Sequence, residues 1–143
     1  TNSRLDTLQA AILNIKLKHL SAWNKKRNMN ANLYFENLSN VREINLPKMR
    51  EGVIHTFHQF VIRAKKRNEL KAFLVQHDVD TVIHYPKALP FEPAYKYLNH
   101  NDKDFPISVA LQEEVLSLPV QPELNKEQIL YVCGLIKSFY ETR

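Results

Sequence analysis

Apolar residues in the first twenty positions follow the period of an α-helix. They recur at spacings of three and four in two adjacent stripes, one made of Leu5, Leu8, Ile12 and Ile15 and the other of Leu13, Leu17 and Leu20. Because two stripes cover more than one narrow seam, we expect this helix to be buried on two sides. We expect Ser3 to cap the helix, with Asp6 completing a capping box, so that the helix begins at Arg4.

The helical pattern continues to Leu38, since residues 4–38 contain neither Pro nor Gly. The sequence therefore predicts one very long helix, or two helices that meet near residues 19–21 with Ser21 as the second cap. The loop that should follow, residues 39–54, leaves room for a short strand at residues 41–44. A helix that needs cover on two sides, with no earlier element to provide it, leads us to expect a fragment of a longer protein.

The apolar period changes from about 3.6 to 2 in residues 56–63, which favours a β-strand. Its side chains should alternate between two faces, with Phe57 and Val61 on one and His58, Phe60 and Ile62 on the other. In that position His58 would bury its ring and bond a backbone carbonyl. His55 would project to the face opposite His58, so we expect no metal site there.

Further elements are predicted downstream. Extended segments are expected at residues 80–84 and 115–118, and irregular chain at 86–93 is followed by a helical turn or two at 94–98. Helices are expected after an Asn68 cap, from Pro106 to about Glu114, and after an Asn125 cap that is paired with Gln128. The last helix carries a buried stripe made of Ile129, Val132, Cys133, Ile136, Phe139 and Tyr140.

This order of elements predicts an α+β fold. It has a small two- to three-stranded sheet with helices on one face, and a long N-terminal helical segment. With 143 residues and 44% hydrophobic content, residues 1–143 should form a single domain. Cys133 is expected to be a small core residue and not a nucleophile, because no basic group is placed to lower its pKa.

Composition excludes several classes of function. The sequence contains no run of 18 apolar residues that could span a membrane, and the chain start lacks the pattern of a signal peptide. A single cysteine excludes an internal disulfide and makes the cytoplasm the expected location. The net charge of +5 includes two clusters, residues 25–27 and 65–67, which we expect to be solvated surface and not a nucleic-acid footprint.

The stretch His84-Tyr85-Pro86 is the clearest candidate for chemistry. A strand must stop at Pro86, because proline has no N–H and forces the preceding residue into an extended geometry. His84 and Tyr85 are then left at a strand end, where they could contact a ligand. The alternative is that both are half-buried and satisfied by backbone groups.

Several motifs resemble one enzyme family. The opening Asn-Ser-Arg-Leu-Asp (residues 2–6), followed by Leu-Gln-Ala-Ala-Ile-Leu (8–13), is similar to a signature of the DegT/StrS-type nucleotide-sugar aminotransferases, which use pyridoxal phosphate (PLP). Further similarities follow in the family's order, at residues 57–63, 83–86, 93–95, 105–106 and 116–119 with Pro122. Together they span nearly the whole chain. The resemblance implies the C-terminal domain of a fold-type I aminotransferase.

The resemblance also implies site residues. Asn2 would reach the PLP phosphate bound by the other subunit of a homodimer, with Arg4 beside it, and the alternative is a capping segment with a surface arginine. His84 and Tyr85 would bind the nucleotide sugar at the mouth of the active site. Asp80, Val82 and Pro90 depart from the family pattern here, so substrate specificity cannot be transferred.

The resemblance finally implies what is missing. The Schiff-base lysine, the partner of the pyridine nitrogen and the ring-stacking residue should precede Asn2, so this chain alone should be inactive, with no catalytic residue and no bound PLP. The implied full-length enzyme would aminate a keto-sugar linked to dTDP or UDP for bacterial surface-polysaccharide (lipopolysaccharide) or related amino-sugar synthesis. Glutamate would be the amino donor, and no nucleic acid or membrane would be a partner. The alternative is a non-catalytic α+β binding module derived from the same fold.

Overall fold

Three antiparallel strands, in the order β1-β2-β3, form the sheet in the computed structural model, which describes residues 4–141. β2 (Phe60–Ala64) is central and pairs with β1 (Ile44–Asn45) and with β3 (Val115–Leu118). Phe60, Ile62 and Ala64 of β2 are buried, whereas Arg63, on the other face, is exposed. This alternation is typical of a sheet covered by helices on one face, and the expected α+β fold is confirmed.

The sheet differs from its prediction at three points. The first strand begins at Ile44 and not at residue 41, and the central strand begins at Phe60 and not at residue 56. The segment 80–84 is not a strand, because it joins the sheet only through a bridge between Val82 and Ser117. Its pairing ends there because the chain turns away at the stretch that leads into Pro86, which cannot donate to a strand ladder.

One hydrophobic core joins the sheet to three helices: the carboxyl half of α1 (Thr7–Leu38), α2 (Arg67–Gln76) and α4 (Lys126–Glu141). Tyr34 of α1 stacks on Phe60 of β2 with the ring centroids 4.9 Å apart. In α4, the predicted stripe is buried except for Tyr140, which is half-buried. Cys133 is 2% exposed, which confirms its core position, and burial raises the pKa of its thiol to about 11.

α1 is one continuous helix, so Ser21 caps nothing. It begins at Thr7 and not at Arg4, because Asp6 and Gln9 form the capping box; the Asp6 amide donates to Gln9 Oε1 at 3.3 Å. The expected cap Ser3 lies outside the described residues. Asn68 is not a cap either, since α2 starts after Lys66, whereas the Asn125–Gln128 box of α4 is confirmed by bonds of 2.9 and 3.0 Å.

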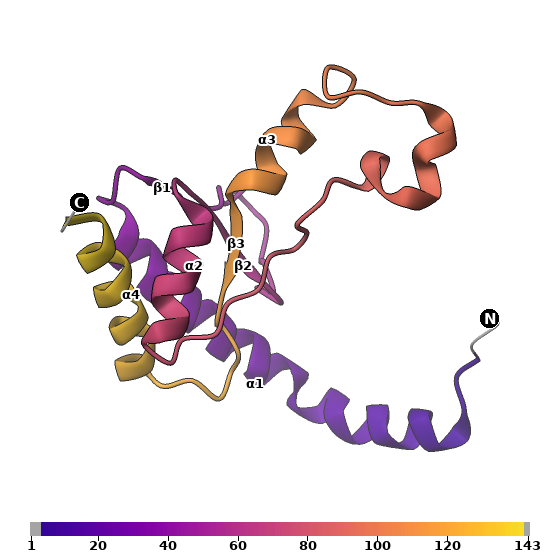
Figure 1. Cartoon of the computed structure of the whole chain (residues 1–143). Coiled ribbons are helices and arrows are strands. Elements are labelled where there is room, and N and C mark those ends of the chain that lie inside the picture. Colours follow the sequence, from indigo (N-terminus) through magenta and orange to yellow (C-terminus); the bar gives the residue numbers. More distant parts are fainter. Residues whose placement is uncertain (1–3, 142–143) are drawn as a thin grey trace.

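The amino half of α1 extends away from the sheet (Figure 1). Leu8 and Leu17, for example, are 72% and 65% exposed, so the chain itself does not bury the two apolar stripes as expected. The stripes lie on a helix that no other described element of this chain covers at that end. None of the helices within residues 4–141 is long and apolar enough to cross a membrane.

A second excursion leaves the body between residue 85 and α3 (Pro106–Glu114) (Figure 1). It contains two 3₁₀ helices, η1 (Leu89–Phe91) and η2 (Pro93–Leu98), and the polar turn after them ends at Phe105. The predicted helical turn at 94–98 and the helix from Pro106 to Glu114 are confirmed. α3 leads directly into β3, so this excursion begins and ends beside the sheet.

Candidate functional site

His84 lies beside Ser117 of β3. Its Nδ1 is 2.9 Å from the Ser117 hydroxyl oxygen, and the imidazole is half-buried. The contact exists because Val82 and Ser117 exchange both backbone hydrogen bonds, with N–H···O distances of 3.3 and 2.8 Å. The bridge brings residue 84 to the edge of the sheet, as expected for a strand end, but His84 is satisfied by a side chain and not by a backbone group.

Tyr85 points away from the core. It is 72% exposed, and its ring meets that of His84 edge to face, with the centroids 5.5 Å apart; the peptide bond between the two residues is cis. The two side chains lie where the chain leaves the sheet, but at the end of a single bridge and not of the predicted strand. Tyr85 remains available for contact with a ligand, whereas His84 offers one ring nitrogen, Nε2, for which the described residues provide no partner.

Three side chains, those of Gln112, Arg67 and Lys71, hold the segments around His84 and Tyr85. The amide N–H of Ala88 donates to Gln112 Oε1 of α3 at 2.8 Å, which fixes the chain four residues after His84. Arg67 donates to the carbonyls of Gln112 and Val115, both at 2.8 Å, and so braces the junction of α3 and β3. Lys71 donates through Nζ to the Thr81 carbonyl on the other side of the bridge.

Arg67 corrects the interpretation of residues 65–67 as a solvated cluster. It is only 5% exposed, because its guanidinium reaches inward to carbonyls 45 and 48 residues away. Sequence reasoning also missed Ser117 and Gln112 as supports of the site. The only signal in the sequence was that Ser117 stands in an otherwise apolar strand, where a hydroxyl needs a partner.

The other predicted site residues lie elsewhere. Asn2 is outside the described residues, and Arg4 is exposed just before α1. The amino half of α1, which follows Arg4, extends away from the sheet that contains β3 (Figure 1). No contact within the described residues joins Arg4 to His84.

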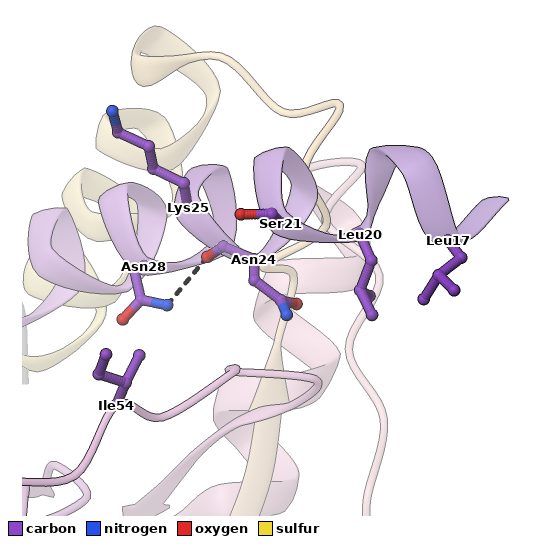
Figure 2. A pocket seen from close by; sticks show the side chains of 7 residues that line it. All are labelled: Leu17, Leu20, Ser21, Asn24, Lys25, Asn28 and Ile54. Carbon is purple, nitrogen blue, oxygen red and sulfur yellow. Dashed lines mark hydrogen bonds between the residues drawn. The ribbon is translucent and has the colours of Figure 1, made fainter.

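An open cavity of about 650 Å³ lies along the middle of α1 (Figure 2). Asn28 closes one side, since its amide donates to the carbonyls of Asn24 at 2.9 Å and His55 at 2.8 Å. The lining residues are Leu17, Leu20, Ser21, Asn24, Lys25, Asn28 and Ile54. No residue that the sequence singled out for binding is among them, so this cavity does not change the choice of site.

His58 is exposed and lies before β2, so the prediction of a buried mid-strand ring is wrong. The reason is that Phe57 adopts a positive φ of 44°, which ends the extended geometry upstream of Phe60. Within residues 4–141 no group of three or more His, Cys, Asp or Glu side chains could hold a metal ion.

Comparison with known proteins identifies the family of the chain. The DegT/DnrJ/EryC1/StrS aminotransferase family matches residues 1–137. A Geobacillus stearothermophilus protein named pleiotropic regulatory protein is 40% identical over 141 residues, which cover 97% of this chain and 38% of the relative. The dTDP-3-amino-3,4,6-trideoxy-alpha-D-glucose transaminase of Streptomyces venezuelae is 36% identical over 141 residues, which cover 99% of this chain and 37% of the relative.

A solved structure shows the same fold. The crystal structure of S. venezuelae DesV in complex with a ketimine intermediate superposes with a TM-score of 0.94 at 35% identity, and the match covers 99% of this chain and 38% of that one. The chain thus spans well under half of the length of the relatives that it matches. Its fold, its motifs and these similarities together show that it belongs to the DegT/DnrJ/EryC1/StrS aminotransferase family.

Proposed function

We propose that this chain is the C-terminal part of a PLP-dependent enzyme that transfers an amino group from glutamate to a nucleotide-linked keto-sugar. One observation carries the proposal: the family match extends over residues 1–137, and therefore over every residue considered for the site. The relative from S. venezuelae is named for such a reaction on a dTDP-linked sugar. For this chain the nucleotide, dTDP or UDP, and the sugar carbon that is aminated are left open.

The donors present at the start of the chain fit one part of PLP, its phosphate. The Asp6 carboxylate accepts from the Gln9 amide and the Gln9 side chain accepts from the Asp6 amide, so these two amides at the start of α1 are not free for an anion. Arg4 is exposed beside it and supplies a permanent positive charge. By the family resemblance, Asn2 and Arg4 are the residues of this chain that would hold the phosphate, and the PLP ring and its Schiff-base lysine would belong to the preceding part of the enzyme.

PLP supplies the electron sink on which amino groups are exchanged. The task of this chain's own site is to bind and orient the sugar nucleotide. His84 and Tyr85 lie side by side where the chain leaves the sheet, with an imidazole nitrogen and a phenol available for hydrogen bonds to hydroxyl or phosphate oxygens. An imidazole at this position also favours an anionic ligand when it is protonated.

The full-length enzyme, in this proposal, is a cytoplasmic homodimer, and the apolar stripes of α1 contribute to its interface. Asn2 and Arg4 of one subunit would then reach the phosphate of the PLP that the other subunit binds. The exposure of Leu8 and Leu17 supports an interface at this end of α1. A role in surface-polysaccharide synthesis, and the inactivity of the 143-residue chain alone, are part of the same proposal and rest on the family resemblance.

The test is the reaction itself. The full-length gene product should show the absorbance of bound PLP and should convert a dTDP- or UDP-linked 3- or 4-keto-sugar to an amino sugar when glutamate is present. The 143-residue chain should do neither. A full-length protein that binds no PLP and aminates no nucleotide sugar would instead support the alternative, a non-catalytic binding module with the same fold.

A further inference from the structure

Ser117 fixes both the backbone and the side chain of the segment that carries His84. It is 7% exposed, and its N–H and C=O are both used in the bridge to Val82. Its hydroxyl is left for the imidazole of His84, 2.9 Å from Nδ1. A single buried residue on a rigid strand therefore determines where His84 lies and how its ring is turned.

The proton on this contact can be assigned from the hydrogen-bond inventory. The Ser117 hydroxyl has no other partner among the described residues, so its hydrogen has one acceptor within reach, Nδ1 of His84. If Nδ1 carried the proton instead, the buried hydroxyl hydrogen would be left without an acceptor, which costs more than an unused lone pair on the same oxygen. The favoured neutral form has the hydroxyl donating to Nδ1 and the ring proton on Nε2.

We propose that Ser117 is a positioning residue that holds His84 in the Nε2–H form, so that His84 acts as a hydrogen-bond donor toward an oxygen of the nucleotide sugar. This inference rests on the proposed function for the identity of the ligand, but the state of the ring is independent of it. A donor at Nε2 matches a ligand rich in acceptors, such as sugar hydroxyls and the diphosphate. Ser117 itself touches no substrate.

The first experiment determines which ring nitrogen of His84 carries the proton. The full-length enzyme with ¹⁵N-labelled histidine is examined by long-range ¹H–¹⁵N correlation, and the His84 signals are assigned by their loss in His84→Asn. The expected result is a single Nε2–H form in the wild type and a mixture of both tautomers in Ser117→Ala. An Nδ1–H form in the wild type, or an unchanged ring in Ser117→Ala, would overturn the proposal.

The second experiment separates positioning from mere support of the fold. Ser117→Ala should raise KM for the nucleotide sugar about fivefold, the loss expected for one hydrogen bond, while kcat and the half-reaction with glutamate stay unchanged. Ser117→Thr keeps the hydroxyl and should restore KM. If Ser117→Thr behaves like Ser117→Ala, or if kcat, the glutamate half-reaction and the melting temperature all fall together, Ser117 only supports the fold.

Thr81→Val is the matched control. Thr81 lies in the same segment and also has a buried hydroxyl, but among residues 4–141 that hydroxyl has no hydrogen-bond partner. Its removal should change neither the His84 tautomer nor KM. The substrate contact of His84 and the positioning role of Ser117 can be tested separately. If His84→Asn leaves KM unchanged while Ser117→Ala still gives a mixture of tautomers, the substrate contact is wrong and the positioning role of Ser117 stands.

Discussion

His84 obtains its orientation from residues that are far from it in the chain. Ser117 is 33 residues away, and the two meet only because Val82 pairs with β3. Gln112 fixes Ala88, and Arg67 in turn braces the backbone of Gln112. At this scale the candidate site consists of a half-buried imidazole, an exposed phenol and the side chains of Ser117, Gln112 and Arg67 that support the segments around them.

His84→Asn in the full-length enzyme should raise KM for the nucleotide sugar several-fold, about 1 kcal/mol, because one hydrogen bond to the substrate is weakened. The half-reaction with glutamate should be spared, because the proposed role of His84 is to bind the nucleotide sugar at the mouth of the active site. Stopped-flow absorbance of the cofactor measures the two half-reactions separately. Equal slowing of both would place His84 in the chemistry and not in substrate recognition.

Asn2→Ala in the full-length enzyme should weaken PLP binding about tenfold or more, because a hydrogen bond to a charged phosphate is lost. Arg4→Ala should act in the same direction. Titration of the apoenzyme with PLP, followed by absorbance, measures the effect, and Asn14→Ala, at an exposed position of α1, serves as the control. Unchanged affinity in both variants would leave Asn2 and Arg4 with a role at the helix start alone.

At the scale of elements, α1 has two halves with different surroundings. Its carboxyl half belongs to the core through Ala31, Tyr34 and Leu38, whereas its amino half carries two apolar stripes into solvent in this chain. The exposed leucines of this half do not gain the free energy that burial would give, about 25 cal/mol per Å² of apolar surface. A covering surface outside this chain is therefore expected.

Leu8→Glu should shift the full-length enzyme from dimer to monomer at micromolar concentration, because it places a charge in the proposed interface. Asn14→Glu adds the same charge at a polar position of the same segment and should remain a dimer. Light scattering measures the mass, and thermal unfolding is followed in parallel. A Leu8→Glu protein that stays dimeric but melts earlier would show that the stripe is covered within one subunit.

At the scale of the whole molecule, three weakly acidic side chains, two of them buried and one half-buried, link stability to pH. Burial raises the pKa of Tyr34, of the Cys133 thiol to about 11 and of Tyr140 to about 12. In each case the folded state keeps its proton to a higher pH than the unfolded state does. Their contribution to stability is therefore complete below about pH 9 and is lost as the pH rises through the folded pKa values.

The melting temperature of the 143-residue chain should accordingly fall between pH 9 and pH 11. Cys133→Ala removes one of these groups, so the fall over that interval should be smaller, even though the variant is less stable at neutral pH. Tyr97→Phe, at an exposed position, should leave the fall unchanged. Circular dichroism at several pH values gives the slope, and an unchanged slope in Cys133→Ala would contradict the assignment.

The sequence alone predicted features that depend on residues close together in the chain. The Asn125–Gln128 box, the helix that starts at Pro106 and the buried stripe of α4 all depend on residues three or four positions apart, and their physics is complete within one or two helical turns. The motifs that indicated the family are also local strings. The α+β class followed from the order of these elements, because the packing of a small sheet against helices leaves few alternatives.

Contacts between distant segments could not be read in this way. Arg67 looked like one of three exposed cations until the fold placed carbonyls of α3 and β3 within its reach. Segment 80–84 had the composition of a strand, but a strand also needs a partner along its length, and β3 offers it a single bridge. The partners of a buried polar group are set by the fold and not by sequence neighbours, so the Ser117–His84 contact emerged only from the tertiary structure.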